Sequence, residues 1–64
     1  MKADRKKLEI AMCRACINSD GLAKAADMPR PTLNNVISGK GVRPATIGKV
    51  AKALGVDVTE ILKD

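Results

Sequence analysis

Aromatic residues are missing from this chain, which has no Phe, Trp or Tyr among its 64 residues. Proteins that bind RNA or single-stranded DNA rely on aromatic rings as stacking platforms for the bases, so the absence argues against those partners. Any hydrophobic core has to be built from Leu, Ile, Val, Ala and Met. Such residues suit a small bundle of helices, and a chain of this length predicts one domain over residues 1–64 with a marginal core.

Histidine is absent too, and Cys13 and Cys16 are the only cysteines. A structural zinc site takes about four Cys or His ligands, so the sequence predicts no metal and no cofactor. The C-x-x-C spacing also lacks the βαβ context of thioredoxin-like redox motifs. We therefore interpret both as small helical residues, with Cys13 or Cys16 partly in the core. The carboxylates form no recognisable acid–base pair and no phosphate-cradling glycine motif is present, so we predict no enzymatic activity.

Long apolar segments are missing as well. Residues 1–10 are charged and lack the continuous apolar stretch of a signal peptide. No segment approaches the roughly 20 apolar residues of a membrane span. The sequence therefore predicts a protein without membrane contact that is cytoplasmic, or associated with the nucleoid through DNA, and it gives no sign of a small-molecule ligand.

Positive charge is plentiful, with 12 Lys and Arg against 7 Asp and Glu and a net charge of +5. The isoelectric point of about 9.6 is typical of a small domain that binds a polyanion, and the lack of aromatics favours duplex DNA. A basic cluster of Lys2, Arg5, Lys6 and Lys7 leaves two interpretations open: phosphate contact, or a solvated helix face.

Hydrophobic periodicity predicts five short helices and no strands. The first runs from about Asp4 to Ile17, with Leu8, Ala11, Met12 and Ala15 on one face. The others are predicted over Ser19 to Ala26 with Asn18 as N-cap, Pro31 to Ile37 with Arg30 as cap, Pro44 or Ala45 to Leu54, and a last short helix through Leu62 that Asp57 and Glu60 open as a capping box.

Residues 18–37 predict a helix-turn-helix. Asp27-Met28-Pro29 separates two apolar stripes, and Asp27 falls where a left-handed backbone is needed. The second of these helices enters the major groove of DNA in such motifs. It carries two adjacent Asn residues, which are poor helix formers, and both Arg and Asn fit the edges of bases. Lys40 and Arg43 flank a glycine-containing loop after it, where contact with phosphate is predicted.

Several segments together resemble the Xre/Cro–repressor helix-turn-helix family. They are Leu22-Ala23, Pro29 to Val36, Ser38-Gly39-Lys40 and Ala51 to Leu62, so the resemblance covers residues 8–62. It implies a compact, all-α, five-helix, lambda-repressor-like fold and a regulator that binds operator DNA. The implied base contacts are Arg30, Pro31, Thr32 and Asn35, and the implied phosphate contacts are Ser19, Asn34, Lys40 and Arg43.

The chain departs from the family at two linked positions. Many members pair an Arg in the first helix with a Glu near the end of the third, and Met12 and Ile37 stand in those places. Well-packed apolar residues can replace a buried ion pair without loss of stability. We therefore expect Met12 and Ile37 to touch.

The resemblance also bears on assembly and function. It implies a homodimer through the last helix and its surroundings, here Val56, Val58, Ile61 and Leu62, which we expect to be weak in solution and to tighten on a pseudo-palindromic operator. We interpret the chain as a transcriptional repressor of phage, mobile-element or bacterial origin. One alternative is an antitoxin or adaptor that uses this fold mainly to bind a partner protein. Another is a nonspecific nucleoid protein, which should carry more charge.

Overall fold

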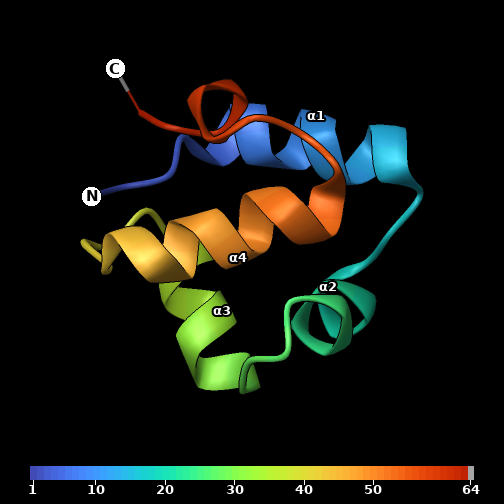
Figure 1. Ribbon diagram of the computed structural model, residues 1–64, viewed down its shortest axis with the longest axis horizontal. Helices are drawn as coiled ribbons and strands as arrows, with labels where there is room; N and C mark the ends of the chain where they lie inside the picture. Colours follow the sequence, from blue (N-terminus) through green and yellow to red (C-terminus); the bar gives the residue numbers. More distant parts are fainter. Residues whose placement is uncertain (64) are drawn as a thin grey trace.

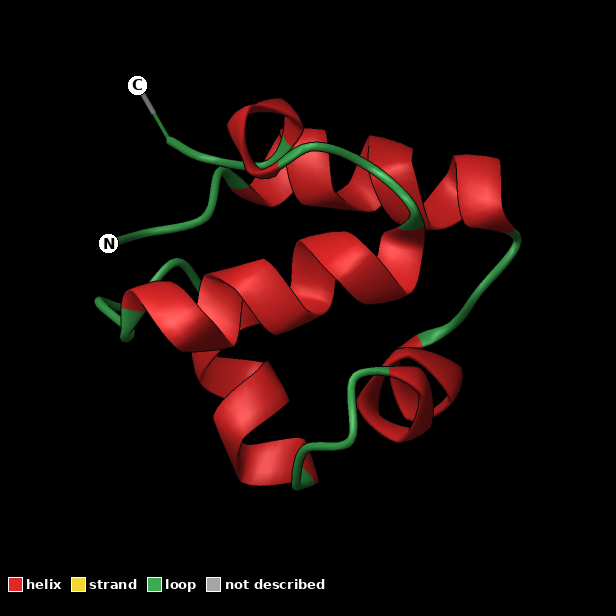
Figure 2. Ribbon diagram, in the orientation of Figure 1, coloured by secondary structure: helices red, strands yellow, loops and turns green. Residues whose placement is uncertain are grey.

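Four α-helices and one short 3-10 turn form the protein, whose computed structural model describes residues 1–63 (Figures 1 and 2). In chain order they are α1 (Arg5–Ala15), α2 (Ser19–Ala25), α3 (Arg30–Ile37), α4 (Pro44–Leu54) and the 3-10 turn η1 (Val58–Glu60). The predicted all-α architecture is confirmed, with the fifth element reduced to a single turn. Within residues 1–63, no helix is long and apolar enough to cross a membrane.

The central element is α4, which packs against α1, α2 and η1, while α2 also packs against α3. Figure 1 shows α4 between α1 on one side and α2 and α3 on the other. The apolar stripe of α4 is buried as its periodicity predicts. Helices α1, α2 and α3 each add side chains to the core, and η1 borders it. The largest fully buried side chains, each less than 2% exposed, are Leu8, Leu22, Leu33, Val36, Ile47, Val50 and Ile61.

All four α-helices end in a Schellman motif, in which a left-handed residue follows the last turn. The left-handed residues are Cys16 (φ 54°), Asp27 (φ 53°), Gly39 (φ 81°) and Gly55 (φ 69°). After each of them the next amide donates to a carbonyl five residues back, at 3.0–3.1 Å: Ile17 to Met12, Met28 to Ala23, Lys40 to Asn35 and Val56 to Ala51. The left-handed conformation of Asp27 is confirmed, and that of Cys16 was not predicted.

The first four residues lie between two other segments of the chain. The amino group of Met1 donates to the carbonyl of Val42 at 2.9 Å, and the amide of Val42 donates back at 2.7 Å. On the other side, Ala3 forms an isolated antiparallel bridge with Leu62, and its side chain is buried. The N-terminal segment therefore links the loop after α3 to the segment after η1, and Figure 1 shows the start of the chain beside the segment that follows η1.

Several helix boundaries differ from the predicted ones, and α2 ends one residue earlier than predicted, at Ala25. The first helix is shorter than Asp4 to Ile17, because Asp4 caps it from outside, its carboxylate accepting from the amide of Lys7 at 3.0 Å. The left-handed Cys16 ends it. In the third helix Arg30 is the first helical residue rather than the cap, and Pro29 holds the extended N-cap position.

The predicted partial burial of Cys13 or Cys16 is wrong, because both are exposed. Helix α1 buries Leu8 and Ala11; Cys13 lies on another face, and Cys16 lies beyond the helix end. Ala15, predicted on the apolar face, is also exposed. The last turn of α1 therefore extends past the elements that cover its earlier turns.

The last predicted helix is shorter than expected, but its capping box is confirmed. The carboxylate of Asp57 accepts from the amide of Thr59 at 3.1 Å, and the carboxylate of Glu60 accepts from the amide of Asp57 at 3.2 Å. The Thr59 hydroxyl also donates to Asp57. This hydroxyl bond and the backbone bond lower the pKa of the Asp57 carboxyl below its usual value.

Candidate nucleic-acid interface

Residues 18–37 fold into two helices joined by a tight turn, as predicted. The side chain of Asn18 caps α2 by accepting from the amide of Gly21 at 2.8 Å. A β-carbon at Gly21 would come within 3.0 Å of the Ile17 side chain and 3.2 Å of the Asn18 amide oxygen. Glycine weakens a helix, but here it leaves room for the cap and for Ile17 to pack over the first turn.

The turn between α2 and α3 is held by backbone hydrogen bonds rather than by glycine. Asp27 takes the left-handed conformation, its amide donates to Lys24 at 3.1 Å, and the Met28 amide donates to Ala23 at 3.0 Å. Ala23 is buried, which fits the small side chain expected where two helices cross closely. Asp is one of the few residues other than Gly that adopt this conformation at modest cost.

Helix α3 presents one polar face to solvent. Its apolar residues Leu33 and Val36 are fully buried. Four of the predicted contact residues of α3 are exposed, namely Arg30, Pro31, Asn34 and Asn35. At about 100° per residue these four fall within one arc of the helix. Thr32 is half-buried and lies at the far edge of that arc.

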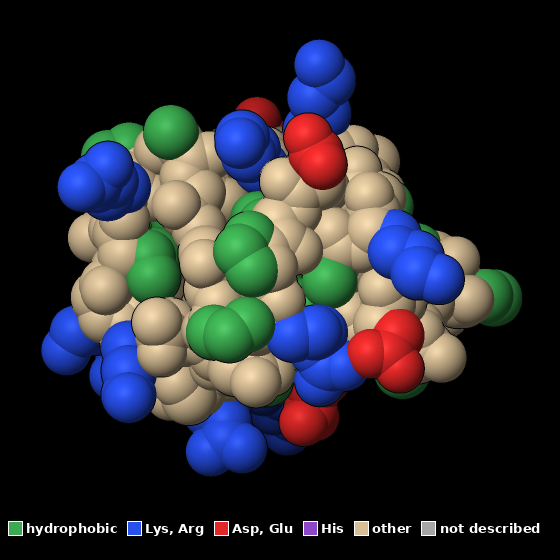
Figure 3. Space-filling view, turned by 90° about the horizontal axis from the view of Figure 1, so that it is seen from below, with side chains coloured by type: hydrophobic (Ala, Val, Ile, Leu, Met, Phe, Trp, Pro, Cys, Tyr) green, Lys and Arg blue, Asp and Glu red, His purple; other side chains and the backbone are tan. Residues whose placement is uncertain are grey.

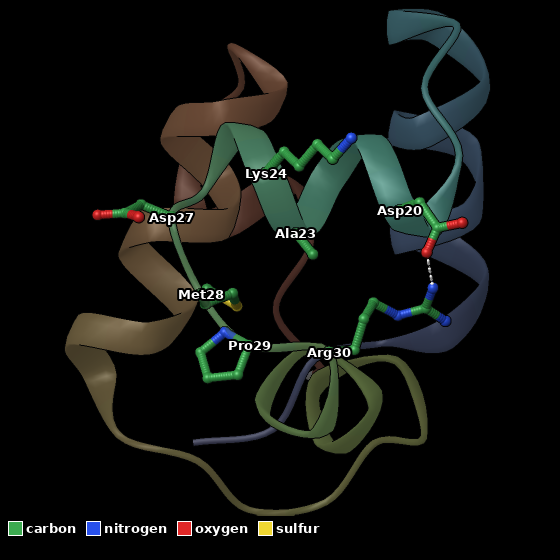
Figure 4. Close-up of a pocket in the computed structure, with 7 residues that line it drawn as sticks. All are labelled: Asp20, Ala23, Lys24, Asp27, Met28, Pro29 and Arg30. Carbon is green, nitrogen blue, oxygen red and sulfur yellow. Dashed lines mark hydrogen bonds and ion pairs between the residues drawn. The ribbon is translucent and has the colours of Figure 1, made fainter.

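Arg30 is held in place by two neighbours. Its guanidinium donates to the carboxylate of Asp20 on α2, and its second terminal nitrogen donates to the amide oxygen of Asn34 at 3.4 Å. Figure 4 shows Arg30 reaching from the start of α3 toward Asp20. Sequence reasoning missed Asp20, because its proximity to Arg30 depends on how α2 crosses α3. Exposed ion pairs contribute only about 0.2–1 kcal/mol to stability, so the main effect is on orientation.

An open cavity of about 500 Å³ lies beside this ion pair, between α2 and the turn that leads into α3 (Figure 4). Both signs of charge line it, with Asp20 and Asp27 against Lys24 and Arg30. Its remaining lining residues are Ala23, Met28 and Pro29. The cavity is a surface hollow within the helix-turn-helix itself.

The other predicted phosphate contacts lie outside α3. Lys40 and Arg43 are exposed in the loop that follows it, and Ser19 is the half-buried first residue of α2. The structure joins Arg30 and Asn34 by a hydrogen bond. Ser38 closes α3, its hydroxyl donating to the carbonyl of Asn35 at 3.1 Å.

A basic groove, lined by Arg5, Lys6 and Lys63, lies beside the C-terminal end of α3. The groove is a cavity of about 300 Å³, and its other lining residues are Ala3, Asp4, Ser38 and Gly39. A β-carbon at Gly39 would lie 3.9 Å from the Arg5 side chain. Two residues of the N-terminal basic cluster, Arg5 and Lys6, therefore share one surface with Ser38 and Gly39 at the end of α3. Lys63 is a member that the sequence analysis did not single out.

Figure 3 views the molecule from the side on which Figure 1 draws α2 and α3. Lys and Arg side chains lie mostly around the rim of this face, with Asp and Glu side chains among them, and hydrophobic and neutral atoms fill much of its centre. This face therefore combines a rim that can attract phosphates with a polar helix that can approach bases.

Among residues 1–63, no group of three or more His, Cys, Asp or Glu residues is arranged to hold a metal ion.

Comparison with known proteins supports the same conclusion. A family model described as "Helix-turn-helix" matches residues 18–61, which include α2, α3, α4 and η1. No curated protein and no solved structure gives a significant match. The match covers more than half of the chain, so the protein belongs to the Xre/Cro-type helix-turn-helix family of DNA-binding regulators.

Proposed function

We propose that this DNA-binding protein is a sequence-specific transcriptional repressor that reads duplex DNA with α3 and blocks polymerase by occupying an operator. The exposed face of α3 carries the proposal. A solvated surface helix would carry Glu and Lys there, whereas this face carries Arg30, Pro31, Asn34 and Asn35. Such a repressor would come from a phage, a mobile element or a bacterial chromosome and act in the cytoplasm.

Arg30, Pro31, Thr32 and Asn35 are the proposed base contacts. An Arg can donate two parallel hydrogen bonds to guanine, and an Asn can pair with adenine in the same way. Arg30 has five N–H donors, so bonds to Asp20 and Asn34 leave donors for a base. Because those bonds already restrict the guanidinium, less conformational entropy is lost when it meets DNA.

Ser19, Asn34, Lys40 and Arg43 are the proposed phosphate contacts, and the basic groove extends them. Arg5, Lys6 and Lys63 border the end of α3, which favours phosphate contact over a merely solvated face. Each phosphate that is neutralised releases counterions, so affinity should fall steeply with salt.

Selection of binding sites from random duplex DNA tests the proposal. Arg30→Ala and Asn35→Ala should each weaken binding to the selected site by about 1–3 kcal/mol and relax preference at one base pair. Lys40→Ala should weaken all sequences alike and reduce the salt slope by about 0.9. Lys52→Ala, which removes an exposed lysine on α4, is the matched control. If Asn35→Ala leaves the selected motif unchanged, α3 does not read the bases as proposed.

Dimerisation on DNA completes the proposal. One short helix contacts few base pairs, whereas two copies on a pseudo-palindrome can specify an operator. Ile61 is fully buried in the core, so it cannot contact a partner. Val56, Val58 and Leu62 are half-buried and are the remaining proposed dimer contacts. Sedimentation at micromolar concentration, with and without a duplex of two half-sites, should show a weak dimer that tightens on DNA. A strict one-to-one complex at saturating protein would exclude it.

A further inference from the structure

Two exposed thiols stand at the end of α1, away from the polar face of α3. Cys13 lies in the last turns of the helix, and Cys16 is the left-handed residue that ends it. The Cys16 amide donates to the Cys13 carbonyl at 3.1 Å, so the backbone between the two residues is a closed turn. In Figure 1, α1 and α3 lie on opposite sides of α4.

Both cysteines open onto one surface cavity of about 520 Å³. Met12 lines it as well, so three sulfur-bearing side chains from five consecutive residues border the same space. The other lining residues are Glu9, Ile17 and Asn18. Met12 and Ile17 are half-buried against the core, which makes the floor of the cavity apolar. A cavity with thiols, a thioether and an apolar floor is suited to a soft ligand.

We propose that Cys13 and Cys16 bind one Cu(I) ion, with the Met12 thioether as a weaker third ligand. Thiolate and thioether sulfur are the ligands that favour Cu(I) among biological metals. On binding, each thiol loses its proton to solvent and its sulfur forms one bond to copper. Two neutral thiols and one Cu⁺ then give a site of charge −1 and two released protons, with no change in oxidation state.

Zinc fits these residues less well. Structural zinc takes about four Cys or His ligands in a tetrahedron, and among residues 1–63 no third His, Cys, Asp or Glu joins the two thiols in a metal-binding group. Cu(I) needs fewer ligands, and two thiolates with a thioether supply them. Selectivity for Cu(I) over Zn²⁺ is therefore a direct consequence of the proposed ligand set.

Both cysteines are free thiols in the structure rather than partners in a disulfide, so both sulfurs are available as ligands.

Competition with a coloured Cu(I) chelator, under anaerobic conditions and with fully reduced protein, tests the proposal. The protein should withhold one Cu(I) per chain, and Cys13→Ser and Cys16→Ser should each weaken binding by ~100-fold or more, because a hydroxyl is a poor ligand for a soft ion. Met12→Leu should weaken it severalfold. Met28→Leu, which changes a half-buried Met in a different cavity, is the control and should have no effect. Zn²⁺ should be lost to a chelator under the same conditions.

Three outcomes would overturn the proposal. Copper retained by both serine variants would place it elsewhere on the chain. One ion per two chains, with copper-dependent dimerisation, would replace the single-chain site by a bridging one. Rapid air oxidation to a Cys13–Cys16 disulfide, with no copper withheld from the chelator by the reduced protein, would make the pair a redox site instead. Circular dichroism spectra of the variants verify that each is folded, and DNA binding is an independent property of α3.

Discussion

Replacing Cys16 with glycine should stabilise the protein. Cys16 has a φ of 54°, and a side chain in the left-handed region costs about 1–2 kcal/mol because its β-carbon crowds the following carbonyl. Glycine avoids that crowding but loses about 0.5–1 kcal/mol more through its greater freedom in the unfolded chain. The Cys16 side chain is exposed, so little packing is lost. The net gain should be about 0.5–1 kcal/mol, or roughly 2–8 °C in Tm for a domain of this size.

Cys13→Gly is the matched control. Cys13 is also exposed but lies inside α1 with helical backbone, where Gly is about 0.3–0.5 kcal/mol less favourable than Cys. This variant should therefore lower Tm while Cys16→Gly raises it. Asp27→Gly, at a φ of 53°, should also raise Tm, but less, because Asp tolerates this conformation better than Cys.

Thermal melts followed by circular dichroism, in reducing buffer that contains a metal chelator, measure these differences. Urea titration at 25 °C gives the free energy of unfolding independently of the heat-capacity term. If Cys16→Gly lowers Tm as far as Cys13→Gly does, the left-handed end of α1 carries no strain that glycine can relieve.

Three further predictions concern individual side chains, the first of them Met12 and Ile37, which each border the core. Met12→Arg should destabilise the protein by leaving an unpaired charge among apolar side chains, and adding Ile37→Glu should recover much of that loss. Thermal melts of both single variants and the double variant measure the coupling. If the loss of stability in the double variant is the sum of the two single losses, the two residues do not touch. Asp20→Ala should strengthen binding to nonspecific DNA by removing a negative charge beside Arg30, yet reduce preference for the base that Arg30 reads. Competition between the selected duplex and a scrambled one separates the two effects. An equal gain in affinity for both duplexes would exclude a positioning role for Asp20. Asp57→Asn should lower Tm at neutral pH and have little effect in strong acid. The hydrogen bonds that lower the pKa of Asp57 in the folded protein stabilise the fold above the pKa of an unfolded Asp, about 3.9, and this stabilisation is lost as pH falls through the lower pKa of the folded state. A difference in Tm that does not change with pH would contradict this role of the Asp57 carboxylate.

Local sequence signals were sufficient for most of the fold. Asp57 and Glu60 predicted the capping box, Asn18 predicted the start of α2, and the α4 periodicity predicted its buried face. Asp27 predicted the left-handed turn between α2 and α3. Each of these depends on residues within a few positions of one another, so neighbouring sequence contains the information.

Features that depend on distant segments were not predictable in this way. Asp20 meets Arg30 only because of the angle between α2 and α3, and Ala3 pairs with Leu62 across nearly the whole chain. The exposure of Ala15 was missed because periodicity shows which face of a helix is apolar, but not how far along its length other elements cover that face. For the candidate site, the sequence singled out the α3 face but not its acidic neighbour.

The pairing of the first residues with Val42 and Leu62 has a consequence for folding. The bond between Met1 and Val42 joins residues 41 positions apart, whereas the hydrogen bonds of α2, α3 and their turn join close neighbours. Because closing a long loop loses more chain entropy than closing a short one, the helix-turn-helix should form early. The pairing of the N-terminal segment with Val42 and Leu62 should form late. Reopening should follow the reverse order. The loop that carries Lys40 and Arg43 would then loosen before α3 does, and the amide of Val42 should exchange its hydrogen with solvent faster than the amide of Leu33.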